Sequence, residues 1–421
     1  MMGQTRAGSP VAAAESVRAK LIHVIGNEIL SPIVESQVYR PLAAQASREG
    51  AEGMVVAVLP LGYLLRSRLR RAVGDLLQRY LEQYGISTRI VYGGTSRLRA
   101  RAWEVASLRH CLRKALPSRK GSVVLGRNCQ AASLVLDAVA GLKHAPQTVF
   151  DCRGDEPFEV VGTLGGGWDP RNWSQKVKEA FDLEQRQQSR ACQADRIIAV
   201  SEIMAKVLHE RHGADLAKVT LKPCAVDLAV FPPPDKQAAR KLLGFDDRLV
   251  VSYLGSLAWY QLPDQGIRLF KLIKQHRPEA LFLGITTEPD RLMGMLAEAG
   301  FGAGDFKVIS VPSKDVAKYL PAADLGLLLR EANPVNAVAS PVKFAEYLAC
   351  GLPVLVTTGI GDYSSIVEKE RLGGVVDIHD DDQTLSAALS GILQRLDADG
   401  QSGGRARRFA EETLNLAPKQ P

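Results

Sequence analysis

Long apolar runs, paired cysteines and abundant aromatic residues are all absent from this 421-residue sequence. No stretch of about 18 or more apolar residues occurs, so the sequence predicts no transmembrane helix. Aromatic residues make up only 6% and form no base-stacking platform, which argues against a nucleic-acid partner. The six cysteines are scattered without a C-x-x-C pair, which is typical of reduced thiols in the cytoplasm and not of a disulfide framework.

Residues at the spacing of metal ligands are also lacking. None of the seven histidines forms a convincing ligand pair, and the scattered cysteines fit no ordinary zinc motif. The acidic run Asp377–Asp382 looks like a carboxylate cluster, but it directly precedes a helical pattern and is better explained as a helix N-cap. The sequence therefore predicts no bound metal and no resident cofactor.

Positive charge is unevenly distributed along the chain. The formal net charge is +7, and the excess of Lys and Arg lies in the first 230 residues, chiefly in 66–71 and 97–120. The second stretch carries a helical apolar stripe, so a basic amphipathic helix is expected. Such a face suits an anionic membrane surface, where each Lys or Arg contributes about 1 kcal/mol, and it equally suits a solvated helix packed on a sheet. We expect a cytoplasmic protein, with peripheral contact at the inner membrane face left open.

Short apolar strands alternate with helical patterns along the whole chain, which predicts α/β domains with parallel sheets and crossover helices. A length of 421 residues fits two domains better than one. Three consecutive prolines in Phe231–Asp235 act as a stiff spacer and mark the boundary. The predicted division is a flexible tail at 1–20, a first domain at 21–231, a second domain at 232–403 and a C-terminal helix region at 404–421.

The most informative stretch runs from Ser340 to Leu355 and is expected to form a loop, a helix and a buried strand. Ser340 is the predicted N-cap, and the proline after it occupies the first helical position. Lys343 and Glu346 are three residues apart, so they share one helical face at the amide-rich end of the helix. An ammonium and free N–H groups suit a diphosphate, and the carboxylate can accept ribose hydroxyls. The pattern predicts capture of a nucleotide diphosphate.

This stretch resembles the donor-binding signature of the retaining GT-B glycosyltransferases of family 4, also called glycosyl transferases group 1, which include bacterial polysaccharide and lipopolysaccharide enzymes. Four other segments are similar to family motifs and occur in family order, at 194–201, 223–231, 253–256 and 323–327. The resemblance implies two Rossmann-like, doubly wound domains facing across a cleft. It also implies a nucleotide-sugar donor on the C-terminal domain and a carbohydrate or lipid-linked acceptor on the N-terminal domain. In the family the C-terminal helix crosses back onto the first domain, and the helix at 404–421 is expected to do the same.

Two positions depart from the family pattern. Val338 stands where the signature carries its first Glu, and Ser256 is followed by Leu257 where the family often has an Arg. Arg330, at the end of the strand before the signature, is the predicted substitute for that cation. The resemblance implies metal-independent transfer with retention of configuration, and Val338 leaves retention or inversion open.

Further candidates follow predicted strands, because ligands of parallel sheets bind outside the carboxyl ends of the strands. The predicted donor-binding residues, besides Ser340, Lys343 and Glu346, are Gly255, Ser256, Ser310, Val311, Gly359, Gly361 and Asp362. An ordinary turn, with Asp362 as the N-cap of the next helix, explains the last three equally well.

In the first domain, the predicted acceptor-side residues are Gly26, Asn27 and Glu28, which follow the first strand. Asp151 and Arg153 follow the fifth strand and are predicted to act in catalysis with Lys343 and Arg330. A buried structural Asp151–Arg153 pair is the alternative.

The function predicted from these observations is transfer of a hexose-like sugar in bacterial surface polysaccharide biosynthesis. Two rivals stay open. One is a sugar-nucleotide epimerase of the same fold, and the other is a catalytically degenerate scaffold in a polysaccharide-synthesis complex.

Overall fold

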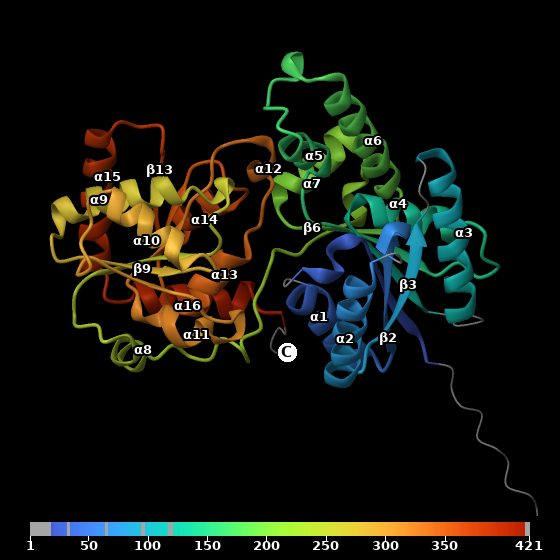
Figure 1. Cartoon of the computed structure of the whole chain (residues 1–421), viewed down its shortest axis with the longest axis horizontal. Coiled ribbons are helices and arrows are strands. Elements are labelled where there is room, and N and C mark those ends of the chain that lie inside the picture. The colour runs from blue at the N-terminus through green and yellow to red at the C-terminus, as the bar shows by residue number, and fades with distance from the viewer. Residues whose placement is uncertain (1–17, 32–33, 64–65, 94–96, 117–120, 417–421) are drawn as a thin grey trace, which may run out of the picture.

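A computed structural model describes residues 18–31, 34–63, 66–93, 97–116 and 121–416. Two α/β domains lie side by side (Figure 1), each built on one parallel sheet. The strand order is β3-β2-β1-β4-β5-β6-β7 in the first sheet and β10-β9-β8-β11-β12-β13 in the second. Both orders reverse beside the first strand of their sheet, which is the doubly wound arrangement. The predicted fold class is confirmed.

The first domain holds the first seven strands and the first seven α-helices. Its strands are β1 (Lys20–Ile25), β2 (Glu52–Pro60), β3 (Ser87–Gly93), β4 (Val123–Arg127), β5 (Gln147–Cys152), β6 (Arg196–Ala199) and β7 (Val219–Leu221). Its α-helices are α1 (Arg40–Glu49), α2 (Ser67–Tyr84), α3 (Arg97–Ala115), α4 (Asn128–Val139), α5 (Glu156–Thr163), α6 (Gln175–Ala191) and α7 (Glu202–His212).

The second domain repeats the pattern. Its strands are β8 (Val250–Leu254), β9 (Leu281–Ile285), β10 (Phe306–Ile309), β11 (Leu325–Leu328), β12 (Val354–Thr357) and β13 (Gly373–Val376). Its α-helices are α8 (Lys236–Leu243), α9 (Pro263–His276), α10 (Pro289–Glu298), α11 (Val316–Tyr319), α12 (Pro334–Ala337), α13 (Val342–Ala349), α14 (Tyr363–Lys369), α15 (Asp382–Ala398) and α16 (Ser402–Thr413).

The central strands of both sheets are apolar because helices cover both faces. Every residue of β8, β9, β11 and β12 is buried. Hydrogen-bonding side chains then fix where several helices begin. Asp381 accepts a hydrogen bond from the Thr384 N–H at 2.8 Å and caps α15, as the acidic run predicted.

The basic helix α3 packs on the first sheet. Leu108 and Leu112 of its apolar stripe are fully buried in the core of that domain, while Trp103 is 60% exposed. The apolar stripe of α3 therefore packs in the core of the domain. Any contact of α3 with a membrane would be made by its solvent-exposed residues. No helix in the described part of the chain is long and apolar enough to cross a membrane.

The chain passes between the domains after Leu221. Val226 and Phe231 already pack in the core of the second domain, and Val226 pairs with Asn415. The final helix α16 packs against α13, with Ala406 and Ala410 buried in the same core (Figure 1). The C-terminal helix thus stays with the second domain, whereas the family resemblance suggested a crossing back onto the first. Residues 1–17 and 417–421 lie outside the described part.

Candidate donor-binding cleft

Lys343 and Gly255 meet at the carboxyl edge of the second sheet. Gly255 follows β8 with a φ of +133°, and a Cβ at this position would overlap the Lys343 ammonium. Lys343 Nζ donates a hydrogen bond to Gln261 Oε1, and Gln261 Nε2 donates to Ser256 Oγ at 2.9 Å. Glycine is therefore required for the lysine to lie across the turn. The structure brings together three residues that the sequence predicted, Gly255, Ser256 and Lys343.

Arg330 follows β11, the neighbour of β8, and is only 8% exposed. Its guanidinium carbon lies 5.1 Å from the centre of the Tyr260 ring, and its Nη1 donates to the Tyr260 carbonyl at 3.2 Å. Within the described residues, neither Arg330 nor Lys343 forms an ion pair with an acid.

The electrostatics of these two cations point to a missing anion. Burial, together with the Arg330 charge, lowers the pKa of Lys343 to about 7, although Glu346 opposes the change. Burial likewise lowers the pKa of Arg330. A buried arginine and a half-buried lysine without an ion-pair partner in the described residues are unfavourable in the free protein, and an anion bound beside them would relieve the penalty.

Glu346 lies one turn after Lys343 on α13. Burial raises the pKa of its carboxyl group, and Lys343 opposes the shift. Among the described residues its carboxylate has no hydrogen-bond partner, so it is free to accept hydroxyl groups. Its predicted role at the ribose stays a prediction.

Ser340 does not cap α13, so that expectation was wrong. Pro341 occupies the N-cap position with an extended backbone. The Ser340 hydroxyl instead accepts the Cys224 N–H at 2.9 Å and lies 2.6 Å from the Tyr363 hydroxyl. These tertiary partners hold the start of the signature against the segment that joins the two domains.

Asp362 occupies the N-cap of α14, but its side chain does not cap that helix. Its carboxylate accepts the N–H groups of Glu202 and Ile203 at 2.6 and 3.2 Å, in the first turn of α7 in the other domain. Asp362 was predicted to cap its own helix, α14, but its carboxylate binds the first turn of α7 instead. The preceding turn has positive φ at Gly359 and Gly361, and a Cβ at Gly361 would overlap the Ala339 carbonyl.

Ser310 and Val311 follow β10 at the edge of the sheet, with β9 between them and β8. Ser310 is exposed, and neither residue lines the cavity between the domains. A role at the nucleotide base therefore stays a prediction.

In the first domain, Asp151 lies between two arginines. Its Oδ2 is 2.9 Å from Arg153 Nε and 3.2 Å from Arg127 Nη1, and Arg127 Nε is 3.2 Å from Glu28 Oε1. Burial alone would raise the pKa of Asp151, but the two arginines hold it below its usual range. Asp151 and Arg153 therefore form an ion pair, as one alternative held, and Arg153 also faces the cavity. The predicted catalytic role of the two residues stays a prediction.

Arg127 ends β4 beside β1, the switch point of the first sheet, and the sequence analysis missed it. The signal in the sequence that could have identified Arg127 is a charged residue at the end of an otherwise apolar strand. Glu28 joins its network, and Gly26 lies beside Asn128. The side chain of Asn27 lies outside the described residues.

A cavity of about 470 Å³ lies between the domains. Its lining from the first domain is Arg153, Glu159, Gly162, Thr163 and Trp168. Its lining from the second domain includes Trp259, Tyr260, Arg330, Asn333, Asn336 and Ser340. A larger cavity, of about 770 Å³, is lined by Leu249, Asp324 and Pro353 at the amino ends of the second sheet, where parallel sheets do not place their ligands.

Val338 connects the two domains. It is 1% exposed within an apolar cluster that otherwise belongs to the first domain, and its carbonyl accepts the Ser201 hydroxyl at 2.9 Å. Where the family signature has a Glu, this chain has an apolar contact between domains.

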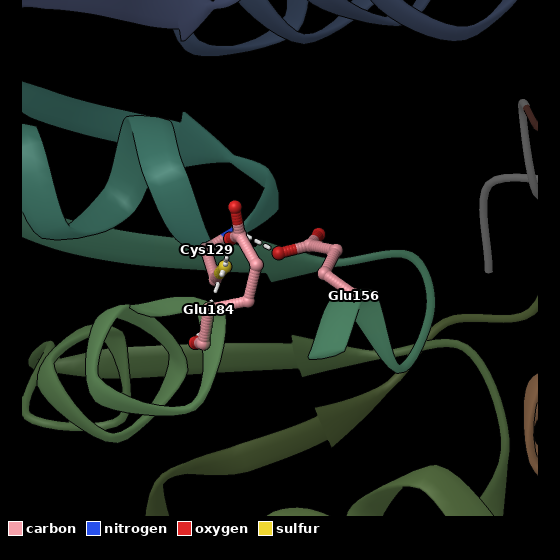
Figure 2. A group of neighbouring side chains, drawn as sticks. All are labelled: Cys129, Glu156 and Glu184. Carbon is pink, nitrogen blue, oxygen red and sulfur yellow. Dashed lines mark hydrogen bonds between the residues drawn. The ribbon is translucent and has the colours of Figure 1, made fainter. Parts of the chain in front are cut away.

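One group of side chains in the described part of the chain has a geometry compatible with a metal ion. Figure 2 shows Cys129, Glu156 and Glu184 turned toward one another, with one potential ligand atom of each within 4.8 Å of the others. Glu156 already accepts the Cys129 N–H at the start of α4, and Glu184 accepts the Cys129 thiol. Burial and both carboxylates raise the pKa of the thiol far above its usual range, so it is protonated and donates. Hydrogen bonding explains this group, and we assign no metal to it.

Residues 235–407 match the family model described as glycosyl transferases group 1. The matched segment coincides with the second domain, which is therefore similar to the glycosyl transferases group 1. This match covers the β8 turn, Arg330 and the whole Lys343 signature, so the family resemblance found in the sequence is confirmed for the segment that carries the predicted donor site.

Curated relatives of the chain include D-inositol 3-phosphate glycosyltransferases. The one from Mycobacterium marinum is 31% identical over 235 residues, which cover 53% of this chain and 47% of the relative. The one from Segniliparus rotundus is 29% identical over 230 residues. The chain spans about half the length of the curated relatives it matches.

Solved structures match both domains together. A glycosyltransferase from Rickettsia africae superposes with a TM-score of 0.67 at 12% identity and covers 95% of each chain. Anabaena Alr3699/HepE in complex with UDP gives 0.65 at 14% identity, covering 94% of this chain and 96% of its own. This likeness confirms the predicted GT-B fold, because both domains and their order are matched.

Proposed function

We propose that this protein is a glycosyltransferase that moves a sugar from a nucleotide-diphosphate sugar to a carbohydrate or lipid-linked acceptor. The observation that carries the proposal is a pair of cations, the half-buried Lys343 and the buried Arg330, without an acid partner in the described part of the chain. Both lie in the segment that matches the family model, at the carboxyl edge of the second sheet. A departing nucleotide diphosphate is the anion that such a site would stabilise.

The proposed mechanism rests on position and charge. The diphosphate would lie against the Gly255–Ser256 turn and the N-terminus of α13, with Lys343 and Arg330 neutralising its developing charge. Holding donor and acceptor together in a closed cleft supplies the remainder of the rate enhancement. These groups do not require a metal, so we propose metal-independent transfer.

Retention of configuration is part of the proposal and follows from the family. In this scheme the diphosphate oxygen takes the proton of the incoming hydroxyl on the face that the leaving group vacates. The apolar contact made by Val338 removes one carboxylate from the donor side, so the anomeric configuration of the product has to be determined by NMR.

UDP-sugars are the first donors to test, because HepE, of the same fold, was crystallised with UDP and with UDP-glucose. We further propose a role in bacterial surface polysaccharide biosynthesis in the cytoplasm. Peripheral contact with an anionic membrane is a secondary proposal, which rests on the basic residues of the first domain.

The test is a panel of UDP-, GDP-, ADP- and dTDP-sugars, read first by thermal shift and then by mass spectrometry of the products. The protein should be stabilised by one nucleotide class and should form a glycosylated product with that donor. Appearance of a free altered sugar without an acceptor would favour the epimerase instead. Stabilisation without turnover over a broad acceptor panel would favour the scaffold.

A further inference from the structure

Aromatic side chains from both domains line the cavity between them. Trp259 is 59% exposed and Tyr260 40% exposed, and both lie in the one-turn 3-10 helix η6 (Trp259–Gln261), just after the Gly255–Ser256 turn. Trp168 lines the cavity from the first domain and packs over Gly162, where a Cβ would lie 3.1 Å from its ring. Flat apolar surfaces therefore reach the cavity from both domains.

A buried hydrogen-bond donor faces the same cavity without a partner. Asn333 is 7% exposed, and its Oδ1 accepts the Asn336 N–H at 2.9 Å at the start of α12. Its Nδ2 has no hydrogen-bond partner among the described residues. A buried, unsatisfied amide donor is costly, so this group calls for a ligand oxygen.

An unpartnered acceptor lies in the cavity as well. Glu159 lines it from α5, and its carboxylate packs against the backbone of Gly154, where a Cβ would overlap it. No hydrogen bond or ion pair to this carboxylate occurs within the described residues. The cavity therefore offers a donor on one side, an acceptor on the other and aromatic faces from both domains.

The charge of the cavity argues against a phosphorylated occupant. Arg153 is paired with Asp151, and Arg330 lies on the side of the predicted diphosphate. Glu159 is shared with a second cavity, of about 340 Å³, whose further lining includes three glutamates (Glu28, Glu156 and Glu184) and two arginines, Arg127 and Arg153. Both of these arginines are paired with acids. A phosphate placed beyond Arg330 would meet the Glu159 carboxyl group and no unpaired cation among the described residues, whereas neutral hydroxyl groups can bond to Glu159 and Asn333.

We propose that this cavity binds the acceptor, and that the acceptor is an uncharged saccharide ring held between Trp168 and Trp259, with its hydroxyl groups on Glu159 and Asn333. The volume lies within the range of roughly 300–1,000 Å³ found for small-molecule sites. The identification of this ligand as the acceptor rests on the proposed transferase function. The preference for a neutral ring rests only on the residues that line the cavity. It sets this chain apart from relatives named for an inositol phosphate.

The test is a binding titration of methyl α-D-hexopyranosides (glucose, galactose and mannose forms) and of D-inositol 3-phosphate, with UDP present, read by saturation-transfer NMR. At least one neutral hexoside should bind more tightly than the inositol phosphate. Trp259→Ala and Trp168→Ala should each weaken it by about tenfold, while Trp259→Phe keeps most of the affinity. Trp103→Ala is the matched control, since Trp103 is equally exposed but lies outside the cavity.

Affinity for UDP separates this inference from the proposed function. UDP should bind equally well to the wild type and to all the tryptophan variants. If the protein binds hexosides but no nucleotide, the proposed transferase function is wrong, while the proposal that the cavity binds a neutral sugar ring is kept. The inference itself is overturned if the inositol phosphate binds best, or if the alanine variants bind hexosides like the wild type. It is also overturned if Trp259→Ala weakens only UDP-glucose relative to UDP, because the ring would then be the donor's.

Discussion

The carboxyl edges of the two sheets carry similar charged residues but pair them differently. In the first domain, Arg127 and Arg153 both lie against Asp151, and Arg127 also meets Glu28. In the second, Arg330 and Lys343 have no acid partner in the described part of the chain. Arginines paired with acids on one side of the cleft, and cations without an acid partner on the other, indicate which side is built to receive an anion. The same comparison explains why the acceptor side suits a neutral ligand.

Of the variants proposed here, Asp151→Asn should have the largest effect, which is a loss in the free energy of unfolding. Removing the shared carboxylate leaves two arginines uncompensated in a buried site, which costs about 3–5 kcal/mol. Urea unfolding should show this loss, while Asp75→Asn, at an exposed position of α2, changes nothing measurable. An Asp151→Asn protein as stable as the wild type would mean that the arginines of the first domain do not depend on this pairing.

Arg330→Met should have the opposite profile. This variant removes a buried cation that has no acid partner in the described residues, so the free energy of unfolding should be kept or increased. Affinity for UDP should fall by roughly 10- to 150-fold, because a charge-assisted contact with the diphosphate is lost. Calorimetric titration measures the affinity. Unchanged UDP binding would show that the unpaired arginine is not a phosphate ligand.

Nucleotide affinity should depend on pH through Lys343. Because the pKa of this lysine is about 7 in the free protein, it is mostly neutral at pH 8–9 and must take up a proton to pair with a diphosphate. UDP affinity should therefore fall as the pH rises above 7, by up to about tenfold per unit. Calorimetry in buffers of different ionisation enthalpy should detect the proton uptake at pH 8. Lys343→Arg should flatten the profile; a flat profile in the wild type would mean that the lysine is already charged.

Asp362→Ala should have the smallest effect, on the contact between domains. The carboxylate caps α7 from the other domain, and loss of a cap costs about 1 kcal/mol. We expect a more open average shape in small-angle X-ray scattering and little change in UDP affinity. Asp235→Ala is the control, because Asp235 caps α8 within its own domain. Identical scattering from the two variants would argue against a role for Asp362 between the domains.

Local patterns carried the predictions that succeeded. The strand alternation predicted parallel sheets with crossover helices, and the family resemblance implied that both sheets are doubly wound. Lys343 and Glu346 are three residues apart on one helix, α13, so their relative position follows from helix geometry. Gly255 lies directly after β8, so its position follows from a single turn. Both Gly255 and Lys343 could be predicted as donor-binding from the sequence: Gly255 because it follows a predicted strand, and Lys343 because it belongs to the signature.

The predictions that failed depend on partners distant in sequence. Ser340 and Asp362 both have the residue type of an N-cap, but Cys224 and the first turn of α7 compete for their side chains. Arg127, which was not predicted, ends β4 and pairs with Asp151 from the neighbouring strand β5. No local rule states which charges find a partner, and that distinction separates the two sides of the cleft.

Calorimetric titration of UDP into the wild type and Lys343→Ala at pH 7 tests most directly whether the unpaired cations form the donor site. The wild type should bind UDP, and the variant should bind it at least about tenfold more weakly without losing thermal stability. Lys271→Ala, an exposed lysine of α9, should match the wild type. Equal affinity for UDP in the wild type and Lys343→Ala would contradict the assignment of the donor site.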